Sequence, residues 1–342
     1  ASDVYKRQAN PRILSIIAAN GLGADCVSGG EVQAALDAGF PADKIVFAGV
    51  GKADWEINLG LDNDIFCFNV ESAVELGIIN ELAAAKNKVA SIALRINPEV
   101  DAHTHAKITT GMKENKFGIN LSQLGGVLDK LKEMKNVKLI GIHSHIGSQI
   151  TDMSSFRNLV IRFNEIQEEL EAHGVTVENL NFGGGLGIDY YHPNHLSIPA
   201  FDNYFAAIHK LLQVRPGQQV HFEPGRSIVA QCGTLISKVL YVKEGETKKF
   251  AILDAGFTEL IRPAMYDAYH RIENISSDEA VETYDVVGPI CESSDVFGKD
   301  VELNKAHRGD LIALRSAGAY GEVMASQYNC RHLPKAYYSD TI

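Results

Sequence analysis

From about residue 10 to residue 226 the chain alternates short apolar runs with stretches of helical periodicity. The apolar runs are expected as strands and the periodic stretches as helices. The expected strands lie at 24–27, 44–47, 65–68, 89–96, 138–143, 177–182 and 219–222. The expected helices lie at 11–19, 29–38, 53–59, 71–85, 121–134, 154–172 and 200–212. Strands and helices that alternate in this way indicate a parallel sheet covered by helices.

A closed barrel of this kind has eight strands, whereas the pattern gives seven. The eighth strand is expected at about 4–8, before the first helix. The residues there are polar and charged where a buried strand is needed, and the chain does not begin with Met. We therefore expect an N-terminus that is truncated or altered.

After about Ser227 the pattern changes to strands without intervening helices. Four are expected, at 233–242, 250–253, 284–287 and 310–314. This succession suggests antiparallel pairing. The expected fold class is α/β, with a (β/α)8 TIM-like barrel over residues 1–231 followed by an antiparallel β domain over residues 232–342.

The composition restricts the class of protein. The 342 residues carry a formal net charge of −11, which argues against a nucleic-acid partner because that needs a basic surface. No apolar run is long enough to span a membrane, and no signal peptide is visible. The five cysteines are scattered and form no Cys-x-x-Cys pair, so we expect a reduced cytoplasmic protein without a structural zinc site.

Two loops follow the last two barrel strands. Residues 181–187 read Asn-Phe-Gly-Gly-Gly-Leu-Gly, and residues 223–226 read Glu-Pro-Gly-Arg. Loops at these places commonly form the phosphate site of a barrel, and glycines let backbone N–H groups approach the phosphate closely. A carboxylate, Glu223, beside a phosphate clamp indicates pyridoxal 5'-phosphate, whose ring nitrogen needs an acid partner. Alternatively, the glycines only link a strand to a helix, and Glu223 pairs with Arg226.

Residues 143–149 read His-Ser-His-Ile-Gly-Ser-Gln at the C-terminal end of a barrel strand, where barrel active sites lie. His143 and His145 point the same way if the strand continues. An imidazole there could stack on a flat cofactor, or the two could bind a metal. The metal hypothesis is weaker because no Asp or Glu follows with ligand spacing, so no metal site is expected. The two histidines could also occupy the strand end without any function.

These segments, with 262–266, 291–295 and 318–321, resemble motifs of the barrel-type (fold type III) pyridoxal phosphate decarboxylases and occur in the same order. The resemblance extends from about residue 10 to residue 331. It implies that His145 stacks on the pyridine ring and that Glu223 pairs with the protonated ring nitrogen. The implied cofactor-binding residues are Lys6, His145, Ser148, Gly184, Gly185, Glu223, Gly225, Arg226 and Tyr320.

The resemblance also implies a substrate site. Its residues are Arg226, Arg262, Tyr266, Glu292 and Tyr320, with Glu292 binding the distal amine. Cys291 is the implied proton donor, although an isolated cysteine could equally be a small buried apolar residue. In this family Cys291 and Glu292 reach the cofactor of the other subunit, so a homodimer with shared active sites is implied. Lys116 resembles the lysine that pairs with the residue at Asp295 across that interface.

Lys6 falls in register with the lysine that binds the cofactor covalently, and would be catalytic together with His145, Glu223 and Cys291. Its neighbours Tyr5, Arg7 and Gln8 do not match the family pattern. Lys6 could therefore also be a terminal lysine that is in register by accident.

A carboxylate opposite the ring nitrogen favours decarboxylation over racemisation. Arg262 and Tyr266 offer partners for a distal carboxylate, and Glu292 offers one for a distal ammonium group. Together they fit meso-2,6-diaminopimelate, whose decarboxylation gives L-lysine and CO2. The alternatives are decarboxylation of another basic amino acid, such as ornithine or arginine, and a non-catalytic homologue or fragment.

Overall fold

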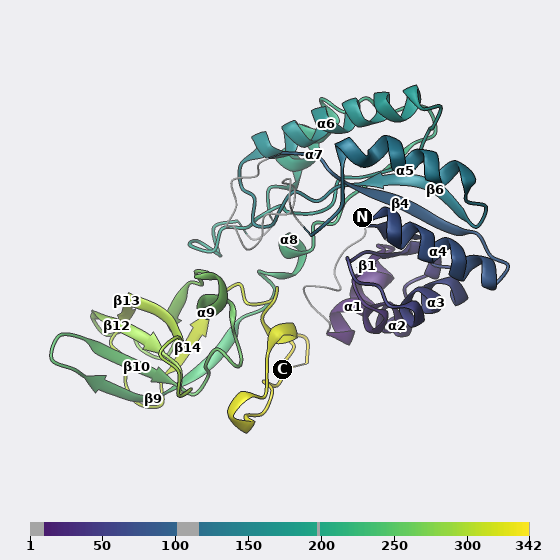
Figure 1. Cartoon of the computed structure of the whole chain (residues 1–342). Coiled ribbons are helices and arrows are strands. Elements are labelled where there is room, and N and C mark those ends of the chain that lie inside the picture. The colour runs from purple at the N-terminus through teal and green to yellow at the C-terminus, as the bar shows by residue number, and fades with distance from the viewer. Residues whose placement is uncertain (1–9, 101–115, 197–198, 342) are drawn as a thin grey trace. The chain divides into compact units, whose positions relative to one another are not determined.

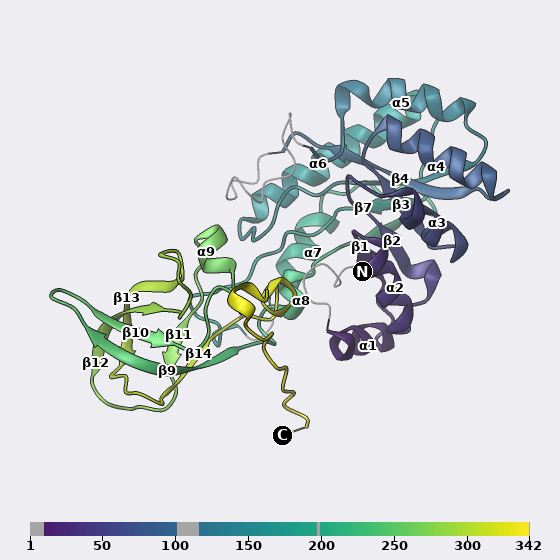
Figure 2. The same cartoon turned by 60° about the horizontal axis from the view of Figure 1, so that its bottom comes forward.

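The computed structural model describes residues 10–100, 116–196 and 199–341. These residues form two compact units. The first holds the described residues up to 187 together with 199–227, and the second holds 188–196 together with 228–341. Figure 1 shows the elements of both units, and Figure 2 shows them from a second direction.

The first unit is built on a parallel sheet. Its seven main strands pair in the order β1-β2-β3-β4-β6-β7-β8, and the short β5 pairs with the end of β4. Their bounds are β1 Ala24–Cys26, β2 Ile45–Phe47, β3 Cys67–Val70, β4 Ala90–Asn97, β5 Ile119–Asn120, β6 Val137–His143, β7 Asn179–Asn181 and β8 Gln219–His221. All seven strands expected in this region are present, and the eighth, expected at 4–8, lies outside the described residues.

Helices separate the strands and lie along the outside of the sheet (Figures 1 and 2). They are α1 Pro11–Ala19, α2 Gly29–Asp37, α3 Asp54–Asp62, α4 Ala73–Ala85, α5 Leu121–Glu133, α6 Met153–Ala172, α7 Phe201–His209 and α8 Arg226–Val229, with a short 3-10 turn, η2, at Ala42–Lys44. Ser28 and Ser72 begin α2 and α4 by accepting hydrogen bonds from the backbone N–H groups of Glu31 and Glu75. The alternation of strands and helices is that of a TIM-like barrel.

The core of the first unit contains a layer with one residue from each of four strands. Val46, Cys67, Ala93 and Ile140 come from β2, β3, β4 and β6 and form one buried cluster. Layers of this kind fill the interior of a parallel barrel. This packing supports the strands up to their C-terminal ends. Polar side chains lie at those ends, among them His143 on β6 and Asn181 on β7.

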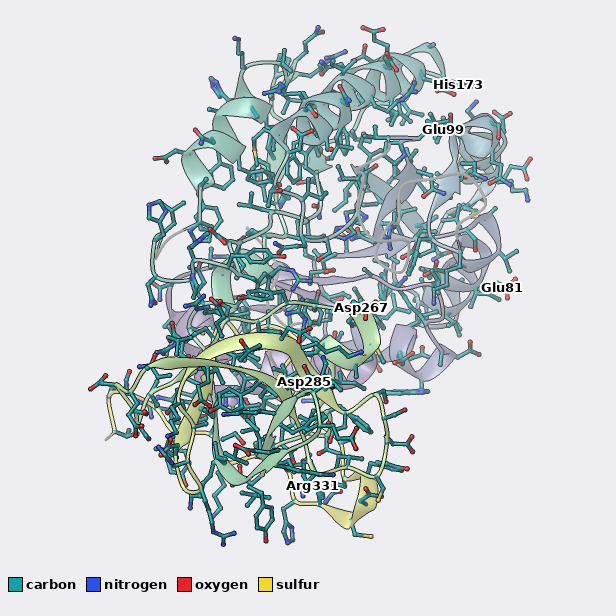
Figure 3. The ribbon with its side chains drawn as sticks, turned by 90° about the vertical axis from the view of Figure 1, so that its left-hand side faces the viewer. Glu81, Glu99, His173, Asp267, Asp285 and Arg331 are labelled. Atoms are coloured by element: carbon teal, nitrogen blue, oxygen red, sulfur yellow. The ribbon has the colours of Figure 1, made fainter. Side chains whose placement is uncertain are left out.

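The second unit contains a six-stranded sheet with the order β11-β14-β9-β10-β12-β13. The strands are β9 Leu235–Glu244, β10 Lys249–Leu253, β11 Ile272–Asn274, β12 Val281–Val287, β13 Val296–Asn304 and β14 Leu311–Leu314. The short helices are α9 Arg262–Tyr266, η3 Glu322–Met324 and η4 Tyr328–Cys330. Helix α9 ends at Tyr266 and is followed by Asp267, which has the left-handed φ of 51° and is labelled in Figure 3.

The four strands expected in this region are present, and β11 and β13 are additional. All neighbours pair antiparallel except β10 with β12, which run parallel. Residues 254–280 join these two strands and include α9 and β11. A connection of that length lets the chain return in the same direction. The domain limits expected from the sequence stay a prediction, and the segment 188–196 groups with the second unit.

A buried ion pair fastens the strand ends of the first unit. Glu71 follows β3, and its Oε1 lies 2.7 Å from Nη1 of Arg95 on β4. The same carboxylate accepts hydrogen bonds from the backbone N–H groups of Gly118 (2.8 Å) and Gly49 (3.2 Å). Burial would raise the pKa of Glu71, but the positive charge of Arg95 and these hydrogen bonds lower it below its usual value. The carboxylate is therefore ionised at neutral pH and connects three loops.

Replacing Arg95 by Met is expected to lower the free energy of unfolding by about 3–5 kcal/mol, because it leaves a buried carboxylate without its cation. The lowered pKa of Glu71 in the native wild type means that its stabilisation is present above the unfolded pKa. That stabilisation is lost as pH falls through the folded pKa. In Arg95→Met the penalty should instead shrink on acidification, because protonation then relieves the buried charge. Chemical denaturation at several pH values measures both trends.

The matched control is Lys132→Met, which removes the exposed pair of Lys132 with Asp129 and should change stability little. Equal losses of stability in the two variants would contradict the role given to the Glu71–Arg95 pair.

Candidate active site

Three side chains meet at the C-terminal ends of the last barrel strands. His143 ends β6, Asn181 ends β7, and Glu223 follows β8 by two residues. The strands are in parallel register, with His143 opposite Asn181 and Asn181 opposite His221. Nδ2 of Asn181 donates to Oε1 of Glu223 at 2.9 Å, and Nε2 of His143 lies 3.3 Å from the same oxygen. The carboxylate of Glu223 is thus buried, and both side chains approach its Oε1.

Two other acidic groups near this carboxylate, the Tyr204 phenol and the Cys67 thiol, have raised pKa values. Burial and the negative charge of Glu223 both raise the pKa of the Tyr204 phenol. Burial, with further contributions from Asp25 and Glu223, raises the pKa of the Cys67 thiol. Neither group ionises at neutral pH, so Glu223 has no neighbouring phenolate or thiolate from Tyr204 or Cys67.

The loops after β6 and β7 are interlocked. Gly183 and Gly185 have left-handed φ values of 64° and 113°. A Cβ at Gly183 would lie 2.3 Å from the carbonyl oxygen of Ser144, and one at Gly185 would lie 2.8 Å from that of Gly147. Both positions require glycine because of the backbone conformation and the close approach of the other loop. The backbone around the expected phosphate loop is therefore fixed before any ligand binds.

His145 is oriented by this loop. Its Nδ1 accepts a hydrogen bond from the backbone N–H of Gly184 at 3.1 Å. A ring nitrogen that accepts carries no proton, so the imidazole is neutral and its proton is on Nε2. The edge of the ring that carries Nδ1 therefore contacts the glycine loop. The stacking role that the resemblance implies for His145 stays a prediction.

Ser148 and Arg226, both expected to bind the phosphate, contact each other. Nη2 and Nε of Arg226 donate to Oγ of Ser148 at 3.0 and 3.3 Å, and both residues are buried. Ser148 adjoins Gly147, whose carbonyl approaches Gly185. A hydroxyl and a planar guanidinium therefore lie beside the glycine loop, and both suit phosphate oxygens.

These residues fit pyridoxal phosphate. The glycine loop, which has no room for a Cβ, and the contacting side chains of Ser148 and Arg226 suit the phosphate at one end of the cofactor. The buried carboxylate of Glu223 suits the basic ring nitrogen at the other end. Gly225 lies in the short turn that joins Glu223 to Arg226. The lysine expected to bind the cofactor, Lys6, lies outside the described residues.

The remaining expected site residues belong to the second unit. Arg262 and Tyr266 are the first and last residues of α9, and Arg262 is buried. Glu292 accepts a hydrogen bond from the hydroxyl of Tyr328 at 3.0 Å. Cys291 is exposed, and Tyr320 has the left-handed φ of 58°.

Asp295 fixes the loop that carries Cys291 and Glu292. Its carboxylate accepts hydrogen bonds from the backbone N–H groups of Phe257 (2.6 Å) and Ile290 (2.7 Å). A Cβ at Gly288 would lie 2.3 Å from this carboxylate. Burial raises the pKa of Asp295 despite these hydrogen bonds. Its expected pairing with Lys116 of another subunit stays a prediction.

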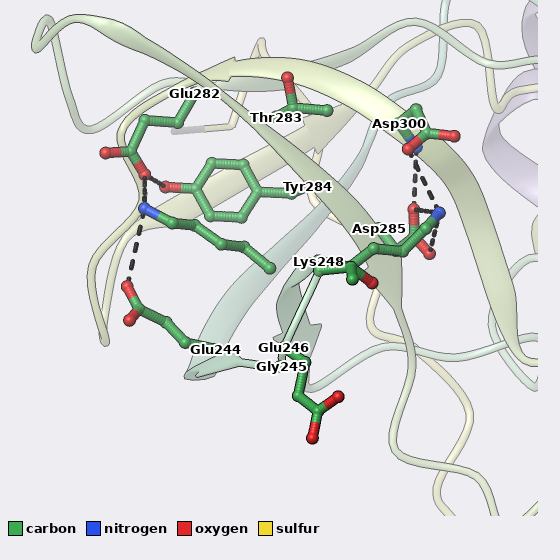
Figure 4. Close-up of a pocket in the computed structure, with 11 residues that line it drawn as sticks. Glu244, Gly245, Glu246, Lys248, Glu282, Thr283, Tyr284, Asp285 and Asp300 are labelled. Carbon is green, nitrogen blue, oxygen red and sulfur yellow. Dashed lines mark hydrogen bonds and ion pairs between the residues drawn. The ribbon is translucent and has the colours of Figure 1, made fainter.

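A charged surface pocket of the second unit contains none of these residues. It lies between the β9–β10 turn and strands β12 and β13 (Figure 4). Lys249 pairs with Glu282 at 2.7 Å, and Lys248 pairs with Asp285 and Asp300 at 3.1 and 3.2 Å. In these pairs both lysines of the pocket already have carboxylate partners. We therefore assign no binding or catalytic role to this pocket.

The fold and site together define a barrel-type enzyme built for a phosphorylated pyridine cofactor. The family model described as "Pyridoxal-dependent decarboxylase, pyridoxal binding domain" matches residues 4–230. The chain belongs to this family, as the resemblance in its motifs indicated. None of the helices in the described ranges is long and apolar enough to cross a membrane.

Within this family the chain is similar to diaminopimelate decarboxylases over nearly all its length. The one from Bacteroides thetaiotaomicron is 67% identical over 337 residues, covering 98% of this chain and 87% of the relative. The one from Zymomonas mobilis is 44% identical over 330 residues, covering 95% and 77%. The crystal structure of diaminopimelate decarboxylase from Helicobacter pylori complexed with L-lysine has a TM-score of 0.89 at 42% identity, covering 95% of this chain and 81% of that chain.

Replacing Gly183 by Ala is expected to destabilise the protein and weaken cofactor binding. The left-handed backbone alone costs a residue with a Cβ about 1–3 kcal/mol, and the new Cβ would collide with the Ser144 carbonyl. Thermal unfolding and titration with pyridoxal phosphate, followed by absorbance, measure the two effects.

Gly126→Ala is the control, because Gly126 lies in α5 and a Cβ there meets nothing within 4 Å. That change should stabilise the protein by about 0.5–1 kcal/mol. If Gly183→Ala bound the cofactor as tightly as Gly126→Ala, the loop would not be the phosphate cradle.

Proposed function

We propose that this protein catalyses the pyridoxal phosphate-dependent decarboxylation of meso-2,6-diaminopimelate to L-lysine and CO2. The observation that carries the proposal is the buried carboxylate of Glu223, which accepts a hydrogen bond from Asn181 and has the ring of His143 at 3.3 Å, beside the glycine loop of Gly183 to Gly185. The 67% identity to a diaminopimelate decarboxylase supports the choice of substrate.

When bound, the cofactor accepts the electron pair that the departing carboxylate leaves behind. Glu223 holds a proton on the ring nitrogen, which makes the ring a better acceptor. Its anchoring through Oε1 keeps the carboxylate at one place, and its burial strengthens the interaction because little water competes. Asn181 contributes by orienting this group through its hydrogen bond before the reaction begins.

The other residues of the first unit bind and orient. His145 stacks on the pyridine ring in its neutral form. Ser148, Gly184, Gly185, Gly225 and Arg226 hold the phosphate. Lys6 would hold the cofactor covalently through its side-chain amine.

The residues of the second unit select the substrate and return the proton. Arg262 and Tyr266 bind the distal carboxylate with Arg226 and Tyr320, and Glu292 binds the distal ammonium group. Cys291 donates a proton to the substrate carbon that has lost CO2, which yields the amine. The loop fixed by Asp295 sets the position of both Cys291 and Glu292.

The protein acts as a homodimer in which Cys291 and Glu292 of one subunit serve the cofactor of the other. Lys116 then pairs with Asp295 across the interface. A cytoplasmic location fits the five free cysteines, which are typical of a reducing compartment. The crystal structure of an arginine decarboxylase from Paramecium bursaria Chlorella virus shares only 21% identity at a TM-score of 0.83, which supports the fold alone and no second substrate.

Glu223→Gln is expected to lower kcat for meso-diaminopimelate at least about 100-fold, or about 3 kcal/mol, because an amide cannot hold the ring nitrogen in its protonated form. Release of CO2 and formation of L-lysine measure the rate. Glu178→Gln is the control, since Glu178 forms only an exposed pair with Lys138. Full activity of Glu223→Gln would sink the mechanism, and a preference of the wild type for ornithine or arginine would sink the substrate.

Mixing two inactive variants tests the shared site. Lys6→Ala and Cys291→Ala should each be nearly inactive, and co-refolding them in equal amounts should restore about one quarter of the wild-type activity. Half of the dimers then carry one variant of each kind, and each such dimer has one intact site. Substituting Cys330→Ala for Cys291→Ala provides the control, because Cys330 is another exposed cysteine of the same unit. No recovery in a mixture that forms dimers would show that each subunit uses its own Cys291.

A further inference from the structure

The guanidinium of Arg262 is held by two uncharged side chains from other segments of the second unit. Its Nη1 lies 3.0 Å from the hydroxyl of Tyr190 and 2.9 Å from Nε2 of His270. The guanidinium carbon also lies 5.0 Å from the centre of the Tyr190 ring, which is cation–π distance. All three residues are buried, with exposed fractions of 6% or less.

The hydrogen bonds of His270 fix its protonation state. Nδ1 lies 2.9 Å from the carbonyl oxygen of Arg315, which can only accept. Nδ1 therefore carries the proton. Nε2 faces a guanidinium, which can only donate, so Nε2 carries the lone pair. The imidazole is neutral and acts as an acceptor toward Arg262.

His270 also connects Arg262 to the sheet. It precedes β11, and Arg315 follows β14. Strands β11 and β14 are neighbours, and the backbone N–H of Arg315 donates to the carbonyl of Arg271 at 2.9 Å. Tyr190 meets the edge of the His270 ring at 5.2 Å and 79°. The guanidinium of Arg262 thus contacts two rings. One is the imidazole of His270, which is hydrogen-bonded to the backbone of Arg315 next to β14, and the other is the ring of Tyr190.

Uncharged acceptors have a specific consequence for a buried arginine. A carboxylate in the place of His270 would neutralise the guanidinium and compete with a second anion. A neutral imidazole and a phenol instead fix the orientation of the guanidinium and add no negative charge of their own. A planar guanidinium of fixed orientation is suited to a carboxylate, which it binds through two parallel hydrogen bonds.

We propose that His270 and Tyr190 are positioning residues that aim Arg262 at the distal carboxylate of the substrate. This inference rests on the proposed function, in which Arg262 binds that group. His270 sets the direction of the guanidinium through Nε2, and Tyr190 supports its face and Nη1. Their contribution is to substrate selection, because neither contacts the reacting carbon.

Two substitutions of His270 separate its two hydrogen bonds. His270→Gln places an amide oxygen near the position of Nε2 and keeps the acceptor for Arg262. His270→Asn places an amide N–H near the position of Nδ1 and keeps only the donor to the Arg315 carbonyl. The measurement is calorimetric binding of L-lysine and of pentane-1,5-diamine to the cofactor-loaded enzyme. L-lysine retains the distal amino-acid head, and the diamine lacks its carboxylate.

The wild type should bind L-lysine more tightly than the diamine. His270→Asn should reduce this preference at least about 10-fold, and His270→Gln should retain most of it. With meso-diaminopimelate, His270→Asn should raise KM about 10-fold and leave kcat nearly unchanged, because the lost contact is the same in substrate and transition state. His307→Asn, at an exposed histidine of the same unit that pairs with Glu279, should leave the preference unchanged.

The two hypotheses fail differently. If the wild type shows no preference for L-lysine, the proposed substrate is wrong. If the preference exists and His270→Asn retains it, or His270→Gln loses more of it than His270→Asn, the positioning role is wrong. Tyr190→Phe removes only the hydroxyl and keeps the ring, so it tests the proposal even if both His270 variants fail to fold. It should reduce the preference several-fold without lowering Tm by more than a few degrees, and an unchanged preference would overturn the role of Tyr190.

Discussion

The candidate active site depends on a buried carboxylate, that of Glu223, which side chains from two neighbouring strand ends approach. Glu223 is 3% exposed, and burying an ion without partners is unfavourable by several kcal/mol. The amide of Asn181 and the ring of His143 approach one of its oxygens, and both come from the ends of neighbouring parallel strands. The register of β6, β7 and β8 therefore does more than build the barrel, because a shift of one residue would turn these groups away from one another.

A second constraint is the close contact of the loops that follow those strands. Gly183 and Gly185 have backbone conformations and neighbours that exclude a side chain, and Gly184 uses its N–H group to orient His145. In the proposed function, the same loop would hold the phosphate and orient the ring of His145. Pre-organisation of this kind matters for catalysis because the groups need no rearrangement when charge develops.

The sequence predicted the barrel strands and helices well because each βα unit has its own hydrophobic period. Strands β11 and β13 were missed: β11 is only Ile272–Asn274, and β13, Val296–Asn304, carries charged residues and a glycine. Glu223 and His145 could be predicted as site residues because they lie in short motifs. The hydrogen-bond partners of Glu223 and Arg262 could not be predicted, because Asn181 is 42 positions from Glu223 in the sequence and Tyr190 is 72 positions from Arg262. Such pairs arise only when strands and loops far apart in the chain come together. For His270, one histidine in a charged and aromatic segment gave no signal of its own.

The buried charged residues fall into two groups, one that stabilises the fold and one that is proposed to bind ligands. Glu71 and Arg95 neutralise each other, and their pairing fastens loops. Glu223 is approached by the amide of Asn181 and the ring of His143, and Arg262 by the hydroxyl of Tyr190 and the ring of His270. A neutral donor or acceptor orients a charged group and adds no opposite charge of its own. A negative group for a protonated ring nitrogen and a positive group for a carboxylate are the two charges that a decarboxylase of an amino-dicarboxylic acid needs. Charges that are buried for binding lower the stability of the native state. The packing of the barrel core and of the β sheet must offset this loss.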